Sequence, residues 1–166
     1  MTEILTPRLR LRRARPEDAE PLFEVFGDAR AMRYWSTPPH VDVGQTRRFV
    51  EAMIGAPAEH SDDFVIELEG RPVGKAGCWR LPEIGYILHP ELWGRGLARE
   101  ALQAVIGRMF DARGLDLLTA DVDPRNTRSI GLLIRLGFHE THRRARTWCV
   151  GEEWCDSVYL QLRRPA

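Results

Sequence analysis

The segment Trp93-Gly94-Arg95-Gly96-Leu97-Ala98 follows an apolar run, Ile84 to Leu88, and opens a stretch with helical spacing. A strand, a glycine loop and a helix in this order predict a phosphate-binding loop. The reason is that the first N–H groups of a helix lack intrahelical partners and carry partial positive charge. The two glycines have no Cβ to keep a phosphate away from the backbone, and Arg99 adds charge beside the arginine of the loop. The segment therefore indicates a cofactor that contains a nucleotide.

Two common phosphate loops do not fit this segment. A dinucleotide-binding loop has a third glycine where Arg99 stands and follows its strand directly, whereas His89-Pro90-Glu91-Leu92 intervenes here. A P-loop closes with Gly-Lys-Ser or Gly-Lys-Thr, but the one lysine of the chain, Lys75, lies elsewhere. Because Gly-x-Gly also occurs in ordinary tight turns, the context of the loop decides between another kind of nucleotide-cofactor site and a plain turn.

The flanks of the loop carry a family resemblance. Ile84-Gly85-Tyr86-Ile87-Leu88-His89-Pro90 before it and Arg99-Glu100-Ala101 after it resemble the acetyl-coenzyme A (acetyl-CoA) site of the GNAT N-acetyltransferase superfamily. A second block, Asn126-Thr127-Arg128-Ser129 followed by Leu136-Gly137-Phe138, is similar to the next cofactor segment of that superfamily. The resemblance implies acetyl-CoA as the co-substrate.

The amino-terminal Leu5-Thr6-Pro7-Arg8-Leu9-Arg10-Leu11-Arg12 resembles the ribosomal-protein-alanine acetyltransferase branch. Trp93 departs from the superfamily signature, which often has Gln or Arg there, but an aromatic residue is usual in this branch. The resemblance spans nearly the whole chain. It implies an N-acetyltransferase that acts on a primary amine, with a protein or peptide amino terminus, such as that of a ribosomal protein, as the leading acceptor. Aminoglycosides, polyamines or amino acids remain open as acceptors, and so does a non-catalytic acetyl-CoA sensor.

Length and composition bound the class of protein. The 166 residues suffice for one domain, 1–166, and 43% are hydrophobic and 29% charged, as in folded soluble proteins. The chain shows neither a membrane-spanning apolar run nor a secretory opening, so we expect a cytoplasmic monomer or homodimer without a membrane partner. Lys and Arg number 24 and Asp and Glu also 24, so the formal net charge is zero and we expect no nucleic-acid partner.

Cysteine spacing argues against disulfides and metal. Cys78, Cys149 and Cys155 are odd in number and form no Cys-x-x-Cys pair. His139 and His142 lie close in sequence, but strand residues three apart point to opposite faces. We therefore expect no metal site.

Apolar spacing and turn residues predict a mixed α/β fold with helices on both faces of a twisted sheet. Arginines alternate with Leu9 and Leu11, so we interpret the runs Arg8 to Arg15 and Arg143 to Arg146 as solvated strand faces. Strands are expected at Arg8–Arg13, Asp63–Leu68, Val73–Arg80, Ile84–Leu88, Leu115–Val122, Phe138–Val150 and Trp154–Leu162. Helices are expected at Pro16–Phe26, Arg47–Ile54 with Asp42 as a cap, Arg95–Phe110 and Asn126–Leu136.

The resemblance adds a splay to this mostly antiparallel sheet. It implies that the strand at Glu83–His89 diverges from the one at Leu115–Val122, with the pantetheine arm of the cofactor in the gap. Unpaired backbone groups of such a strand bind the pantetheine amides as a further strand would. The implied cofactor contacts are Ile87, Leu88, His89, Gly94, Arg95, Gly96, Leu97, Ala98, Arg99 and Asn126.

Acetyl transfer requires a neutral amine, a donor for the oxyanion and a proton for the departing thiolate. Glu83, at the start of the splayed strand, is a candidate base or an exposed carboxylate after a turn. A backbone N–H near Leu88 is the candidate oxyanion donor. Leu133 occupies the place of the tyrosine that many relatives use as the acid, whereas Ser129 resembles the serine proposed for this branch. Ser129 is equally plausible as a helix-capping residue, and Asn126 could cap the helix, contact pantetheine or do both, with the matching block favouring the cofactor contact.

Two further segments are candidates for acceptor binding. Met32-Arg33-Tyr34-Trp35-Ser36-Thr37-Pro38-Pro39 reads as an aromatic loop, either a packed connector or a wall of the acceptor pocket, with Trp35 as the candidate contact. Asp156 matches an acidic position of the branch and would bind an ammonium group, or else is a strand-face aspartate with an arginine neighbour.

Overall fold

The computed structural model describes residues 2–166, and within them eight strands form one open sheet with the order β1-β2-β3-β4-β5-β6-β8-β7. Every neighbouring pair is antiparallel except β5 and β6, which run parallel. The mixed α/β, mostly antiparallel fold is therefore confirmed. In chain order the elements are β1 (Glu3–Leu5), β2 (Leu9–Arg12), η1 (Pro16–Asp18), α1 (Ala19–Phe26), α2 (Val43–Gly55), β3 (Asp62–Leu68), β4 (Arg71–Arg80), β5 (Glu83–Leu88), η2 (Pro90–Leu92), α3 (Leu97–Asp111), β6 (Leu117–Val122), α4 (Thr127–Arg135), β7 (His139–Val150) and β8 (Glu153–Arg163).

Helices cover both faces of the sheet, as expected. One hydrophobic core joins α3, through Leu102, and α4, through Leu133, to one face. A second core joins α1, through Phe26, and α2, through Val50, to the other face, where it includes Ile87 of β5. One face of the sheet therefore packs against α3 and α4 and the other against α1 and α2. Successive side chains of β5 point alternately to these two faces.

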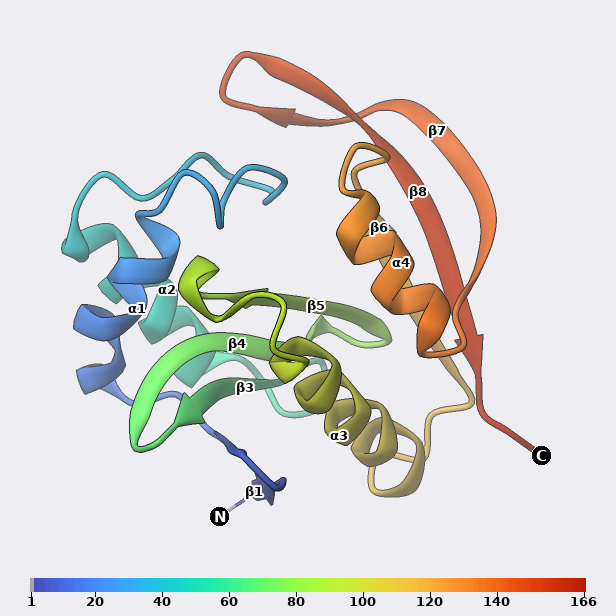
Figure 1. Ribbon diagram of the computed structural model, residues 1–166, viewed down its shortest axis with the longest axis horizontal. Helices are drawn as coiled ribbons and strands as arrows, with labels where there is room; N and C mark the ends of the chain where they lie inside the picture. Colours follow the sequence, from blue (N-terminus) through green and yellow to red (C-terminus); the bar gives the residue numbers. More distant parts are fainter. Residues whose placement is uncertain (1) are drawn as a thin grey trace.

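The two central strands diverge after a single point of pairing. Glu83 of β5 lies opposite Thr119 of β6, and this is the one register pair that joins these strands within residues 2–166. The N–H of Thr119 also donates to the carbonyl of Pro82 at 3.1 Å. Beyond this point β6, α4, β7 and β8 turn away from β1 to β5 (Figure 1). The expected splay is present, and Glu83 lies at its origin.

Local signals set the helix ends. The Asp42 carboxylate accepts from the N–H of Gln45 at 2.9 Å and caps α2, as predicted. The Asn126 amide oxygen accepts from the N–H of Ser129 at 3.3 Å and caps α4. Gly137 has φ 101°, a value that favours glycine, and ends α4 as expected.

Several element boundaries differ from the predictions, and three of the differences have a clear physical reason. Strand β1 was not predicted, because three residues carry too little periodicity to reveal a strand. The helix expected from Pro16 begins with the 3-10 turn η1 before α1. The helix expected from Arg95 begins at Leu97, because Gly96 before it has a left-handed φ of 75°.

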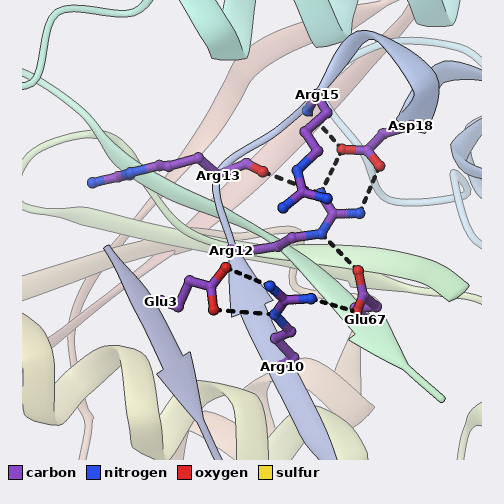
Figure 2. Close-up of polar contacts among 7 residues, drawn as sticks. All are labelled: Glu3, Arg10, Arg12, Arg13, Arg15, Asp18 and Glu67. Atoms are coloured by element: carbon purple, nitrogen blue, oxygen red, sulfur yellow. Dashed lines mark hydrogen bonds and ion pairs between the residues drawn. The ribbon is translucent and has the colours of Figure 1, made fainter. Parts of the chain in front are cut away.

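The interpretation of Arg8 to Arg15 as a solvated face is wrong for Arg12. Its side chain is 5% exposed and donates to Asp18 at 2.8 Å and to Glu67 at 2.6 Å. Arg10 reaches Glu3 and Glu67 in the same network (Figure 2). Alternation had distinguished the two faces of β2 correctly, but helix η1 and α1 cover the polar face. The network ties η1 to β2 and β3, whereas the run Arg143 to Arg146 is exposed as expected.

The structure also describes the cysteines, the lengths of the helices and the grouping of side chains that bind metals. Cys78 is buried, Cys149 exposed and Cys155 half-buried, and all three are free thiols. Across the described chain, every helix is too short or too polar to cross a lipid bilayer. Residues 2–166 also bring together no three His, Cys, Asp or Glu side chains that would hold a metal ion.

Candidate active site

The glycine loop lies between the end of β5 and the start of α3. Gly94 and Gly96 both have φ 75°, in the left-handed region that favours glycine. A Cβ built at Gly94 would meet nothing within 4 Å among the described residues, and one at Gly96 would meet only Arg8 Nη2 at 3.5 Å. No described side chain caps the first turn of α3. The loop therefore offers open backbone and the positive end of a helix to an anion.

The amino-terminal segment braces this loop. Arg8 Nη1 donates to the carbonyl of Arg95 at 2.8 Å, and Arg8 Nε donates to Glu100 at 2.7 Å. The Thr6 hydroxyl donates to the same carboxylate at 2.6 Å. Burial acts to raise the pKa of Glu100, but these hydrogen bonds outweigh it and lower the pKa. Glu100 thus stays ionised and holds the loop against the segment before β2.

The side chains of the loop divide into anchors and free charges. Leu97 is buried in the core and Ala98 is half-buried, so both offer the backbone rather than the side chain to a ligand. Arg95 and Arg99 are exposed beside the loop. The arrangement supplies guanidinium groups at the surface and N–H groups beneath them, which suits phosphate.

The backbone that faces the gap belongs to Leu88. The N–H of His89 donates to the carbonyl of Val73 on β4 at 2.8 Å, so this residue pair is hydrogen-bonded. Opposed residues of an antiparallel ladder alternate between bonded and non-bonded pairs. Leu88, opposite Gly74, therefore turns its N–H and carbonyl away from β4, whereas Ile87 turns its groups toward β4. Of the three residues proposed to bind pantetheine through the backbone, Leu88 has the right orientation.

Trp93 connects both sides of the mouth of this gap. Its indole N–H donates to the carbonyl of Leu88 at 2.9 Å. The guanidinium of Arg128, on α4, lies 4.8 Å from the centre of the Trp93 ring. The aromatic residue that departs from the superfamily signature therefore links β5 to α4.

A hydroxyl of helix α4 meets a hydroxyl of strand β5 beside the gap between β5 and β6. Ser129 lies in the first turn of α4, and Ser129 Oγ lies 2.7 Å from Tyr86 Oη of β5. Leu133, one turn further along, is buried in the core. Sequence reasoning missed Tyr86 as a functional candidate, although its position two residues before Leu88 on an alternating strand was a usable signal.

Glu83 points to the face of the sheet opposite Tyr86 and Ser129. Side chains alternate along β5, so Glu83 lies on the same face as Ile87, which packs in the core with α1 and α2. Although the residue is exposed to solvent, partial desolvation raises the pKa of the carboxyl, the charge of Asp121 raises it further, and Arg80 opposes both. Asp121 lies on β6, two residues beyond the position that pairs with Glu83, and accepts from the indole N–H of Trp148 at 2.9 Å. A carboxylate with a raised pKa is a stronger base, so this environment suits proton acceptance.

The aromatic loop between α1 and α2 is packed near this face. Trp35 meets Phe26 edge-on at 6.0 Å between ring centres, and Lys75 Nζ lies 5.6 Å from the Trp35 ring. The guanidinium of Arg125, which precedes α4, lies 5.6 Å from the Tyr34 ring. The loop thus reaches from the α1 core to the segment between β6 and α4, as a wall of an acceptor pocket would.

Asp156 is not brought together with Glu83. Its carboxylate accepts from the backbone N–H of Arg146 at 2.9 Å, where β7 bulges and Arg146 has φ 55°. Val158 and Leu160 lie in the core beneath α3 and α4, so Asp156 shares their face by alternation. This aspartate stabilises a bulge on the face opposite Glu83.

Comparison with known proteins agrees with this geometry. Residues 8–139 match the family described as the acetyltransferase (GNAT) domain. The chain therefore belongs to the GNAT family and is an N-acetyltransferase. It is 31% identical over 149 residues to the uncharacterized N-acetyltransferase p20 of Bacillus licheniformis, covering 84% of each chain. It is 29% identical over 139 residues to the spermidine N(1)-acetyltransferase of Escherichia coli K12, covering 78% of this chain and 72% of the relative.

A solved structure extends the likeness of the fold. The ribosomal L7/L12 alpha-N-protein acetyltransferase RimL, in complex with coenzyme A, superimposes with a TM-score of 0.86 over 98% of both chains. Its sequence identity to this chain is 16%, so this likeness concerns the fold alone.

Proposed function

We propose that the protein transfers the acetyl group of acetyl-CoA to a primary amine, with a protein or peptide α-amine as its preferred acceptor. The observation that carries this proposal is the gap between β5 and β6, which has an open glycine loop at one end and Glu83 at its origin. The backbone of Leu88, the loop and the first turns of α3 and α4 are the residues that would hold the cofactor, which supplies the activated acetyl group.

The base favours an α-amine. The ordinary pKa of an α-amine is near 8 and that of lysine near 10.4, so presenting lysine as a neutral amine costs about 3 kcal/mol more. The raised pKa makes Glu83 a stronger base than an ordinary carboxylate, and a proton passes to it, directly or through water, more readily from an α-ammonium than from a lysine ammonium. The Leu88 N–H is a fixed donor for the oxyanion, and Ser129 is the donor of the proton that the thiolate needs.

A polyamine is the second candidate acceptor. Asp121 and Glu83 lie on the same face, and their two carboxylates favour an acceptor that carries additional ammonium groups. The spermidine acetyltransferase among the relatives is consistent with this alternative. A sensor that binds acetyl-CoA without turnover is the third possibility.

A matched acceptor screen tests the proposal. Purified protein is incubated with acetyl-CoA and one acceptor, and release of the coenzyme A thiol is followed together with the mass of the acceptor. The acceptors are a peptide with a free amino terminus, the same peptide with a blocked amino terminus and one lysine, spermidine, and free amino acids. We expect the free α-amine peptide to give the highest kcat/KM. A higher kcat/KM with spermidine would make a polyamine the preferred acceptor instead of an α-amine. Acetyl-CoA binding without any transfer would favour the sensor.

A further inference from the structure

Two hydroxyl groups meet across the gap from elements that are distant in sequence. Tyr86 of β5 and Ser129 of α4 are 43 residues apart, and their oxygens lie 2.7 Å from each other. The Tyr86 ring packs against the core beneath α3 and α4. This contact lies on the face opposite Glu83, so the gap has a carboxylate on one side and a hydroxyl pair on the other.

Ser129 alone is a poor proton donor. An aliphatic hydroxyl is a weaker acid than a thiol, so it does not by itself give up a proton readily to a departing thiolate. A phenol has an ordinary pKa near 10, close enough to that of a thiol near 8.5 for proton transfer at modest cost. The residue that supplies a phenol in many relatives is replaced here by the buried Leu133.

The environment of Tyr86 keeps its proton in place. Burial raises the pKa of the phenol, whereas the hydrogen bond with Ser129 and the charge of Arg135 oppose this effect. The phenol therefore remains protonated at neutral pH and is able to donate to Ser129 Oγ, and the two opposing effects offset part of the loss of acidity that burial causes. The N–H of Ser129 is already bonded to Asn126, which fixes the backbone of the serine.

Resting on the proposed function, we propose that Tyr86 is a positioning residue that supplies the leaving-group proton through Ser129. The Ser129 O–H bond breaks as the S–H bond of coenzyme A forms, and the Tyr86 proton moves to Ser129 Oγ. Tyr86 then regains a proton from water, while Glu83 passes the proton taken from the amine to water. Counted from the neutral amine, the nitrogen loses one proton through Glu83 and the thiolate gains one, so there is no net change; an acceptor that arrives as an ammonium releases one further proton to water. β5 thus supplies the phenol that α4 lacks.

A double-mutant cycle tests this relay. Tyr86→Phe, Ser129→Ala and the double variant are compared by kcat, using acetyl-CoA and the acceptor with the highest turnover in the screen. General acid catalysis contributes about 100-fold or more, so we expect Tyr86→Phe to lower kcat by about 10- to 100-fold and Ser129→Ala by at least as much. In the Ser129→Ala background, Tyr86→Phe should have less than about a twofold further effect, because a relay acts as a unit.

Tyr159→Phe is the matched control, since this tyrosine of β8 stacks on His142 of the edge strand at 4.4 Å between ring centres. We expect its kcat to stay within about twofold of the wild type. Thermal midpoints identify a purely structural effect. A Tyr86→Phe variant that melts earlier but keeps wild-type kcat, or losses that multiply in the double variant, would overturn the relay. Failure of the wild-type protein to acetylate any amine would instead count against the proposed function.

Discussion

Alanine at Gly94 or Gly96 should weaken acetyl-CoA binding far more than it weakens the fold. Both residues have φ 75°. In the described structure an added Cβ would meet nothing within 4 Å at Gly94, and at Gly96 it would lie 3.5 Å from Arg8 Nη2. The cost to the unliganded protein is therefore the left-handed conformation itself, about 1–2 kcal/mol. Gly114 provides a matched control outside the loop, because it has φ 67° and its Cβ would also meet nothing within 4 Å in residues 2–166.

The binding cost follows from the open side of the loop. If the phosphates of acetyl-CoA approach this backbone, an added methyl group displaces one of them and removes a hydrogen bond to a charged group. Such a bond contributes about 1.5–3 kcal/mol, which corresponds to a rise in Kd of about 10- to 150-fold. Isothermal titration with acetyl-CoA measures Kd, and circular dichroism melts verify that each variant is folded at the titration temperature.

Comparison of the three glycine variants separates a loss of phosphate contacts from a loss caused by backbone strain. Gly94→Ala, Gly96→Ala and Gly114→Ala should lose similar stability, but Gly114→Ala should keep the wild-type Kd. Loop variants that bind acetyl-CoA as tightly as Gly114→Ala would refute the assignment of this loop to phosphate. An equal loss of affinity in all three would attribute the effect to strain instead.

Two further predictions concern the acceptor face and the amino-terminal network. Asp121→Asn removes a charge that raises the pKa of Glu83. Glu83 then loses its proton at lower pH, so the acidic limb of the kcat/KM profile should move to lower pH, and an unchanged limb would contradict its role as the base. Arg12→Leu leaves the buried carboxylate of Asp18 without its cation and leaves Glu67 with Arg10 alone, at 3.4 Å, which should lower the free energy of unfolding by about 3–5 kcal/mol in urea titrations. A loss below about 1 kcal/mol would show that the network contributes little.

The regular elements could be predicted because their signals are local. Alternation in β2 and helical spacing in α3 follow from the sequence, and so do the cap at Asp42 and the left-handed end at Gly137. The start of α3 could not be placed as well, because the dihedral angles of Gly96 decide it and Gly-x-Gly permits several loop conformations. Strand β1 depends on its pairing with β2, which a three-residue segment does not encode.

The candidate site likewise contains features that are encoded locally in the sequence and features that depend on how distant elements are placed. The glycine loop follows from its motif and Leu88 from the family resemblance, whereas the orientation of the Leu88 backbone toward the gap depends on the register of β4 and β5. The contact between Tyr86 and Ser129 depends on how β5 and α4 are placed in space, and the effect of Asp121 on Glu83 depends on the register of β5 and β6. Arg12 illustrates the limit of patterning, because alternation identifies a face but not the elements that cover it. The role of Asp156 likewise depends on a bulge in the neighbouring strand.

A crystal structure of the complex with coenzyme A and a bound acceptor amine tests the central claim most directly. The account predicts the pantetheine arm between β5 and β6, its sulfur on the side of Ser129, and the phosphates on the backbone of Gly94 to Ala98. It also predicts the acceptor amine on the face covered by α1 and α2, within about 2.6–3.2 Å of Glu83 or linked to it by one water. A pantetheine arm outside this gap, or an acceptor on the face of α3 and α4, would contradict it.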